Sequence, residues 1–364
     1  MLMRKYIGQI IMLLAVVSCA TTEESQLAPL KHARLLTMQK HDGWTEAQIR
    51  NPWDTTKVMQ KLAIIEDSEA KPGVGKDVTV INAPLKHSLV MSSVHCSLIA
   101  ELNSVDAIAA VCDAEYVKEK SVAVRIKEGK IKDCGNSMTP AVEQIAMVKP
   151  DAVLISPYKD NDLTKLNQLG INMVQCADYM EPTPLGRAEW VRLYGMLVGK
   201  VAEADSLFSE VEKHYLTLKS DTVSGPKIIS DSKYGEVWYV PTGNSTVGQM
   251  YADAGGVNPF SDRKENGSVA LSPEEVLMKA KDGDVWILKS DGEMTLDQLR
   301  QADPINSQFK AFAEGNVWHC NTVETPFYEQ TPFHPNLLLE DFVYIFHPEK
   351  RAGKTLHYFK KMEH

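Results

Sequence analysis

Several short apolar runs in the first half of this chain end in polar or aromatic side chains. Ser88 to Ser92 (SLVMS) and Ala152 to Ser156 (AVLIS) are compact enough to be buried strands, and a helical pattern follows each of them. In a parallel α/β sheet, ligands bind beyond the carboxyl ends of the strands. We therefore expect a ligand-binding edge formed by Ser92, Ser93, His95, Ser156, Tyr158, Asp178 and Tyr179.

These residue types do not make a catalytic or metal motif. The chain has no GxSxG, P-loop or HExxH motif, and the acidic pairs Asp113 with Glu115 and Glu274 with Glu275 have no base or nucleophile beside them. A zinc site needs several converging ligands, whereas the 10 histidines are scattered. We therefore expect a binding protein rather than an enzyme, with no bound metal ion and no resident cofactor.

Length, charge and cysteine usage indicate how many domains the chain has and exclude several classes of protein. The 364 residues are enough for two domains of ordinary size. A formal net charge of -9 argues against general binding of nucleic acid, which needs a basic face. Five cysteines beyond Cys19, widely spaced and without a CxxC pair, fit neither a disulfide framework nor a zinc knuckle. Cys112 and Cys134 could at most form one bridge.

One long helical stretch, Pro184 to Ser220, separates the elements that would position the polar residues. Gly199-Lys200 divides it into two predicted helices, Leu185 to Val198 and Val201 to Leu218. The second helix carries apolar residues at alternating spacings of three and four, which form one stripe along it. Because a continuous helix does not hinge widely without a kink, we expect it to join two lobes that close only slightly.

The N-terminus has the pattern of an export signal. Arg4 and Lys5 precede the apolar run Ile10 to Val17, which ends at Cys19. This pattern resembles a bacterial lipobox, in which the cysteine is lipidated and becomes the mature N-terminus. The run is too short for a membrane span, which needs about 20 residues. We expect a lipid anchor at Cys19 on the periplasmic face of either bacterial membrane. Surface exposure is the alternative, because Glu23-Glu24 follows.

Apolar strands alternate with amphipathic helices on both sides of the long stretch, which is typical of parallel sheets. The predicted fold class is α/β, with two Rossmann-like lobes joined by a single long rigid helix. The expected organisation is a signal peptide (1–19), a flexible tether (20–32), a small β-rich extension (33–77), a first lobe (78–183), bridging helices (184–220), a second lobe (221–334), and a closing helix with a tail (335–364).

Several phrases of the sequence resemble one family. AVEQIAMVKPDAVLIS, PTGNSTVGQMYADAGG, LSPEEVLMKAKDGDVWIL and the long bridging helix are similar to the periplasmic substrate-binding proteins for iron complexes and cobalamin. NPWD, PTPLGRAEW and FYEQTPFHP followed by IFHPE resemble a subgroup of Bacteroidetes lipoproteins. The resemblance covers about Leu85 to His347. It implies the helical-backbone periplasmic binding protein fold, in which two rigid lobes close on a metal chelate and deliver it to an ABC importer.

The resemblance also implies roles for two glutamates. In the family, one surface glutamate on each lobe pairs with arginines of the permease, and the matching positions are Glu143 in AVEQI and Glu274 in SPEEV, with Glu275 as the alternative. Exposed ion pairs contribute about 0–1 kcal/mol each, so these would set registration and on-rate more than affinity. The expected partners are the permease and its ATPase, the chelate and the membrane, and the chain is expected to be a monomer.

A bulky chelate needs aromatic walls and few polar anchors. Trp238 lies within EVWYV and suits a core as well as a wall, while Arg187 could meet an anionic chelate or pair with a neighbouring glutamate. An axial role for His95 toward haem or a corrinoid is less favoured, because a histidine at a helix start more often makes a local hydrogen bond. The ligand-cleft residues that we expect are Ser93, His95, Tyr158, Tyr179, Trp238, Tyr239, Ser245, Phe327 and Tyr328.

The sequence therefore predicts a lipid-anchored substrate-binding protein of an ABC importer that captures an iron complex between its lobes. The resemblance favours a ferric siderophore over cobalamin and haem. A surface lipoprotein that captures its ligand for an outer-membrane transporter is the alternative.

Overall fold

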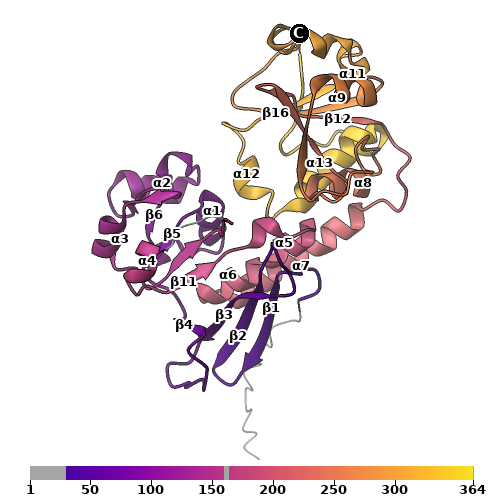
Figure 1. The fold of residues 1–364 in the computed structure, drawn as a ribbon. Coiled ribbons are helices and arrows are strands. Elements are labelled where there is room, and N and C mark those ends of the chain that lie inside the picture. The colour runs from indigo at the N-terminus through magenta and orange to yellow at the C-terminus, as the bar shows by residue number, and fades with distance from the viewer. Residues whose placement is uncertain (1–29, 160–163, 364) are drawn as a thin grey trace, which may run out of the picture.

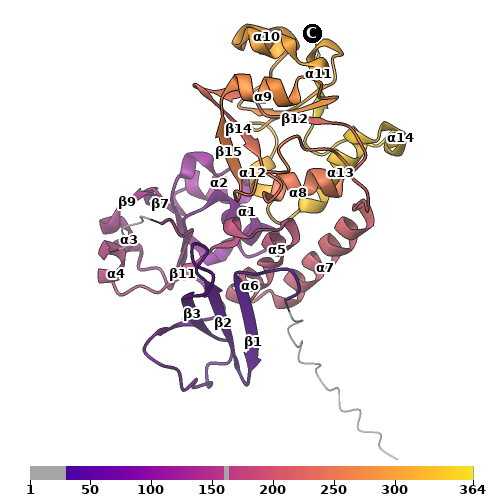
Figure 2. The same ribbon diagram turned by 45° about the vertical axis from the view of Figure 1, so that its right-hand side comes forward.

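The chain folds into three parts that meet at the bridging helices, of which α7 (Val201–Leu218) is the longest. The computed structural model describes residues 30–159 and 164–363. An N-terminal sheet lies at the bottom of Figure 1, a first α/β lobe at the left and a second α/β lobe at the upper right. Figure 2 shows the same three parts after a turn about the vertical axis. The predicted signal peptide and its Cys19 lie outside the described residues.

The N-terminal sheet has four strands in the order β1-β2-β3-β4. The first three pair antiparallel, and β4 pairs parallel to β3. Buried and partly exposed residues alternate along β2, as expected of a strand with one face on a core. The segment predicted as a small β-rich extension, 33–77, contains three of these strands, and the fourth begins directly after it. The strands are β1 (Leu36–His41), β2 (Trp44–Arg50), β3 (Val58–Ile65) and β4 (Val78–Asn82).

The first lobe is built on a parallel sheet with the order β11-β10-β5-β6-β7. Every residue of its central strands is buried, because helices cover both faces, and this explains their short, continuous apolar sequences. The strands are β5 (Ser88–Val90), β6 (Ile108–Val111), β7 (Lys132–Asp133), β10 (Val153–Ile155) and β11 (Met173–Gln175), and the helices are α1 (Ser93–Glu101), α2 (Lys120–Lys127), α3 (Val142–Val148) and α4 (Thr164–Gln168).

One predicted helix of this lobe begins later than expected. The sequence predicts a helix from Asn136 to Val148, but α3 begins only at Val142. The preceding residues form a small antiparallel pair, β8 (Gly135–Asn136) and β9 (Thr139–Pro140). A proline disfavours helical backbone at the residue before it, so Pro140 keeps Thr139 extended and delays the helix.

The bridging stretch contains three helices rather than two. The predicted helix from Leu185 to Val198 is divided at Trp190 into α5 (Pro184–Glu189) and α6 (Val191–Leu197). The predicted bounds of α7 are confirmed. The middle of the predicted stripe, Ala204, Phe208, Val211 and Tyr215, is buried, and its two ends, Val201 and Leu218, are half-buried. Gly199, with a φ of 70°, makes the turn between α6 and α7.

Helix α7 connects the two lobes physically. At its start it packs on α6, whose Leu197 carbonyl accepts a 2.8 Å hydrogen bond from Leu85 N of the first lobe. At its end the Tyr215 hydroxyl donates a 2.7 Å hydrogen bond to Asp253, in α8 (Thr246–Asp253) of the second lobe. The lobes also touch directly, through a 2.9 Å contact between His334 Nε2 and Glu101 Oε1.

The second lobe combines two sheets. One has the order β12-β16-β17-β18, with β12, β16 and β17 parallel, and β18 from the C-terminal tail antiparallel to β17. The other is antiparallel, with the order β13-β14-β15. The strands are β12 (Ile228–Ser230), β13 (Lys233–Tyr234), β14 (Val237–Pro241), β15 (Ser268–Leu271), β16 (Val285–Ser290), β17 (Val317–Asn321) and β18 (Lys360–Lys361). The further helices are α9 (Pro273–Ala280), α10 (Leu296–Ala302), α11 (Lys310–Ala313), α12 (Phe327–Gln330), α13 (Pro335–Phe346) and α14 (Pro348–Arg351).

The cysteines belong to the cores. All five in the described ranges are buried and carry free thiols, so Cys112 and Cys134 do not form the one bridge that the sequence left open. Both residues lie in an apolar cluster of the first lobe. Burial raises the pKa of the Cys112 thiol to about 12, so it stays protonated and packs as a small apolar group. Among the helices of the described ranges, none is long and apolar enough to cross a membrane.

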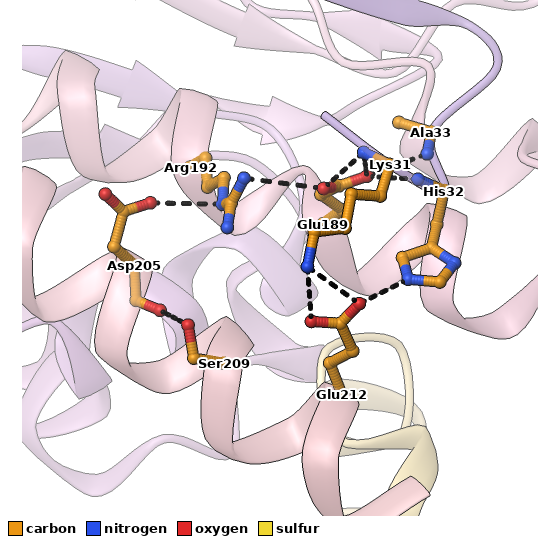
Figure 3. Close-up of polar contacts among 8 residues, drawn as sticks. All are labelled: Lys31, His32, Ala33, Glu189, Arg192, Asp205, Ser209 and Glu212. Atoms are coloured by element: carbon orange, nitrogen blue, oxygen red, sulfur yellow. Dashed lines mark hydrogen bonds and ion pairs between the residues drawn. The ribbon is translucent and has the colours of Figure 1, made fainter. Parts of the chain in front are cut away.

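Two buried glutamates bind the backbone of the first described residues of the chain, and Figure 3 shows one of them, Glu189. The Glu189 carboxylate accepts hydrogen bonds from three successive backbone N–H groups, those of Lys31 (2.8 Å), His32 (2.7 Å) and Ala33 (2.9 Å). Glu181 accepts from the next two, at Arg34 and Leu35. Arg192 lies beside Glu189 at 3.5 Å, so this buried carboxylate also has a cationic partner. We call this arrangement the N-terminal clamp.

Candidate ligand-binding cleft

A cavity of about 440 Å³ lies where the bridging helices meet the second lobe. That volume is within the usual range for small-molecule sites, roughly 300–1,000 Å³. Helices α5, α8, α12 and α13 and the ends of β12 and β16 form its wall, and Val94 of α1 contributes from the first lobe. Its lining is mainly apolar and aromatic, including Met250, Tyr251, Phe327, Tyr328 and Phe342, with charged groups at Arg187, Asp231 and Lys289.

Arg187 enters this cavity from α5 and is held from behind by a buried carboxylate. Its Nε lies 3.3 Å from Asp178 Oδ2. The other oxygen of Asp178 accepts from the Tyr194 hydroxyl at 3.0 Å and lies 2.8 Å from His95 Nε2. A guanidinium has five N–H donors, so the contact through Nε is compatible with donation to a ligand by the terminal nitrogens. Asp178 therefore positions Arg187 at the cavity wall.

This arrangement favours the ionised form of Asp178. Burial opposes ionisation, but the contacts with His95 and Arg187 and the Tyr194 hydroxyl hold the pKa of Asp178 below its ordinary value. A carboxylate whose pKa is lower in the folded state stabilises the fold above its unfolded-state pKa, about 3.9, and loses that contribution as the pH falls through the folded-state pKa.

We expect Asp178→Asn to lower the free energy of unfolding at pH 7 by about 1.5–3 kcal/mol, the usual contribution of hydrogen bonds to a charged group. The difference from the wild type should shrink as the pH falls below about 4, where the wild-type carboxylate also takes up a proton. Urea unfolding of both proteins at a series of pH values measures this. A difference that stays constant down to pH about 2 would contradict an ionised Asp178.

Lys289 and Asp231 bring a second pair of charges to the cavity. Lys289 lies near the carboxyl end of β16, and its Nζ is 2.5 Å from Asp231 Oδ1. Asp231 follows β12 with a φ of 54°, a left-handed conformation that aspartate tolerates better than most residues. Burial alone would lower the pKa of Lys289, but the adjacent Asp231 raises it, so Lys289 is a cation at neutral pH. Its ammonium lies 5.9 Å from the centroid of the Phe327 ring.

A smaller cavity of about 240 Å³ lies at the carboxyl edge of the first-lobe sheet. It follows β5, β6 and β10, the place where the sequence predicts the ligand-binding edge. Asp113, with a φ of 50°, accepts hydrogen bonds from Asn136 Nδ2 at 3.0 Å and from Ser137 N at 3.1 Å. The cavity is lined by Met91, Ser92, Ser93, Asp113, Tyr116, Ser137, Ile155, Ser156 and Tyr158.

Four of the predicted cleft residues line one of these two cavities. Ser93 and Tyr158 line the first-lobe cavity, while Phe327 and Tyr328 of α12 line the larger one. Tyr179 lies beside Tyr158, with 6.3 Å between the ring centroids, and its hydroxyl donates to the Pro157 carbonyl. The structure therefore assembles these predicted residues around two recesses rather than one.

Other predicted residues have structural positions instead. Trp238 is fully buried between Trp286 and Phe309, because the inward face of β14 packs on the second-lobe core. Its prediction as a cleft wall is wrong. Tyr239, the next residue along β14, is 49% exposed but is not among the residues lining either cavity. Ser245 is the N-cap of α8 and accepts a 2.9 Å hydrogen bond from Gly248 N, so its hydroxyl serves the helix.

His95 is also a correction to the sequence prediction. It is 2% exposed, and its Nε2 lies 2.8 Å from both Asp178 and the Tyr194 hydroxyl. Its other ring nitrogen, Nδ1, is buried. In this structure His95 therefore presents neither a cleft wall nor an accessible axial ligand. Within the described residues there is no group of three or more histidine, cysteine, aspartate or glutamate side chains able to hold a metal ion.

Glu143 and Glu274 lie on the surfaces of different lobes. Each is the second residue of its helix, Glu143 in α3 and Glu274 in α9, and each is exposed. The alternative candidate, Glu275, instead forms a 2.6 Å ion pair with Arg263. Glu274 is therefore better placed than Glu275 to meet a partner protein.

The sequence prediction missed Lys289 and Asp231. Lys289 lies near the carboxyl end of β16 (VWILKS), and Asp231 directly follows β12 (IIS), so both lie at the carboxyl edge of the second-lobe sheet. The rule that predicted the first-lobe edge applies equally here. That signal was present in the sequence, whereas the contact between them depends on a pairing of distant strands, β12 with β16.

Two α/β lobes joined through a continuous helix, with a cavity where the bridging helices meet the second lobe, are the architecture of a two-lobed binding protein. Residues 92–323 match the family model described as periplasmic binding protein, which covers more than half of the 364 residues. The chain belongs to the periplasmic binding protein family. This confirms the family predicted from the sequence, while the narrower resemblance to Bacteroidetes lipoproteins stays a prediction.

Two relatives are lipoproteins of Methanocaldococcus jannaschii whose function is uncharacterised. One is 29% identical over 91% of this chain and 85% of its own length. The other is 28% identical over 84% of this chain and 81% of its own length. The chain therefore spans most of the length of both relatives.

Solved structures share the fold at low sequence identity. The TroA-like periplasmic binding protein FepB of Veillonella parvula matches with a TM-score of 0.60 and 16% identity, over 78% of this chain and 97% of that one. The periplasmic haem-binding protein HutB of Vibrio cholerae matches with a TM-score of 0.55 and 16% identity, over 71% and 98% of the two chains. A protein of the ABC-type Fe3+-hydroxamate transport system of Saccharomonospora viridis matches with a TM-score of 0.54 and 20% identity, over 74% and 96%.

Proposed function

We propose that this protein is the substrate-binding lipoprotein of an ABC importer and that it captures an iron complex, with a ferric siderophore as the favoured ligand. The lipid anchor at Cys19 would hold it at the membrane, and Glu143 and Glu274 would meet the permease. The transported complex is cargo, so the protein needs no resident cofactor.

The observation that carries this proposal is the cavity where the bridging helices meet the second lobe. An aromatic and apolar lining suits the organic shell of a chelate, and the cations Arg187 and Lys289 suit anionic groups on it. The shared fold of a protein of an Fe3+-hydroxamate transport system and of a haem-binding protein supports an iron complex as the ligand.

Cobalamin and haem remain alternatives within the same fold. The propionates of haem are anionic and could pair with Arg187 or Lys289. The same two cations would therefore serve a haem as well as an anionic siderophore. The buried position of His95 argues against that residue as the axial ligand of a haem or a corrinoid. A surface lipoprotein that captures ligand for an outer-membrane transporter would use the same cavity but would not engage an inner-membrane permease.

Native mass spectrometry after incubation with individual ligands tests the function directly. The probes are ferric enterobactin, which is anionic, ferrichrome, which is neutral, haemin and cyanocobalamin. We expect ferric enterobactin to be retained in preference to ferrichrome, because two cations face the cavity. Retention of none of the four would overturn the proposal, and conversion of a probe to a new product would support an enzyme instead.

Removing the charge of Lys289 should weaken chelate binding. We expect Lys289→Met to raise the Kd for ferric enterobactin by about 10- to 100-fold, since a charge-assisted hydrogen bond contributes roughly 1.5–3 kcal/mol. Lys227→Met is the matched control, because Lys227 pairs with Asp282 at 2.5 Å outside the cavity lining. Fluorescence titration measures the Kd of each variant. Equal affinities for the two variants would show that Lys289 does not bind the chelate.

A further inference from the structure

Helices α3 and α9 carry the same surface pattern on two different lobes. When the first residue of each helix is numbered one, each helix has a glutamate at its second position, a buried apolar residue at its fourth and a methionine at its sixth. The residues are Glu143, Ile145 and Met147 in α3, and Glu274, Val276 and Met278 in α9. The two helices also match in which of these residues are buried. Ile145 and Val276 both pack into a core, whereas both methionines are exposed.

The two methionines are unusually exposed for large apolar side chains. Met147 is 74% exposed and Met278 is 76% exposed. Residues four apart lie on the same face of a helix, so each methionine stands beside the glutamate of its own helix and opposite the buried residue. A single exposed apolar residue is ordinary on a protein surface. Two at the same helical position, each next to an exposed glutamate, form a repeated feature.

The repetition indicates the kind of partner that this surface fits. A glutamate is complementary to a basic group on the partner, and the adjacent methionine would bind in an apolar recess beside that group. Methionine is flexible and polarizable, and it is enriched where protein interfaces lose water. Because the pattern occurs once on each lobe, the partner must present the same basic group and recess twice, as two related subunits do. Helices α3 and α9 lie apart on separate lobes in both views (Figures 1 and 2).

We propose that Met147 and Met278 are paired apolar anchors for the two permease subunits of the importer, each inserted beside the basic group that meets Glu143 or Glu274. This inference rests on the proposed function. The methionines would add a short-range apolar contact to the ion pairs that the two glutamates form with the permease. The glutamates steer and align the two proteins, and their effect weakens with salt, whereas burial of the methionines slows dissociation and is much less sensitive to salt.

The test uses the full-length protein loaded with ferric enterobactin and the permease–ATPase complex of the same organism, held in lipid nanodiscs. We expect Met147→Ala and Met278→Ala each to raise the Kd for this complex about tenfold, and the double variant about a hundredfold. The loss should persist at high salt. Chelate affinity and thermal unfolding should be unchanged, because neither side chain lines a cavity or joins a buried cluster.

Leu216→Ala is the matched control. Leu216 is 52% exposed on α7, away from α3 and α9, so its replacement should not weaken docking. If the double methionine variant binds as tightly as the wild type while reversal of Glu143 and Glu274 prevents binding, the inference is overturned and the proposed function stands. An equal loss in Leu216→Ala would also overturn it. If the wild type neither retains a chelate nor binds the permease complex, the proposed function fails and the inference fails with it.

Discussion

Replacing Glu189 by alanine is expected to lower the free energy of unfolding by about 3–5 kcal/mol, the range for removing one partner of a buried ion pair. The Glu189 side chain is fully buried and accepts hydrogen bonds from the backbone N–H groups of residues 31–33. Its removal leaves those donors unpaired and leaves the buried Arg192 with less negative charge beside it. The N-terminal clamp thus loses its largest hydrogen-bonding group.

Urea unfolding followed by circular dichroism measures this change, and Glu210→Ala is its control. Glu210 is an exposed residue of α7, so its replacement should change the free energy of unfolding by less than about 0.5 kcal/mol. Hydrogen exchange at residues 31–33 supplies a local readout, since their N–H groups should lose protection in the Glu189 variant. Equal stability of the two variants would show that the clamp contributes little to the fold.

The clamp has a consequence for any lipid anchor at Cys19. The described chain begins just before the clamp, and the clamp fastens it to α5 rather than to the outer surface of either lobe. In the proposed function, a tether that reaches the membrane would therefore hold the protein at the bridging helices. Both lobes would be left free to meet a ligand and a permease.

Much of the lobe architecture could be predicted because it depends on local pattern. The stripe of apolar residues predicted the bounds of α7, and continuous apolar runs predicted the buried strands β5 and β10. The N-terminal clamp could not be predicted in this way. Glu189 and His32 are 157 positions apart, and nothing near either residue indicates their contact.

The cleft was harder to predict for a related reason. Trp238 and Tyr239 are adjacent in one strand, so their side chains point to opposite faces, and the sequence of the strand does not say which face meets the core. The packing of β14 on the second-lobe core, against Trp286 and Phe309, decides this and places Trp238 inside. Similarly, His95 has the chemistry of a ligand-binding residue, but packing against Asp178 and Tyr194 buries it.

The continuous helix α7 bears on how the importer would distinguish loaded from empty protein. It has no proline or glycine within its bounds, so it has no ordinary site for a kink. We expect only small changes in the distance between Glu143 and Glu274 when a ligand binds. A large rotation of the lobes between empty and loaded forms would contradict this account of the bridge.

Reversing both glutamates, with Glu143→Lys and Glu274→Lys, is expected to abolish uptake of the chelate by cells and to leave its affinity for the purified protein unchanged. An exposed ion pair contributes only about 0–1 kcal/mol, but reversal does more than remove it. It places like charges against each other at both contacts, and such juxtaposition costs several kcal/mol. Each single reversal should reduce uptake partially, because the other lobe still docks correctly.

Radioactive-iron uptake and titration with ferric enterobactin separate the two effects. Glu210→Lys is the control for charge, since Glu210 is an exposed helical glutamate on α7 rather than on α3 or α9. Its uptake should match that of the wild type. If the double reversal weakens chelate binding instead, the glutamates act on the ligand and not on the permease. If uptake persists with normal affinity, docking by charge at these two positions is excluded, and the interface must lie on another face of the lobes.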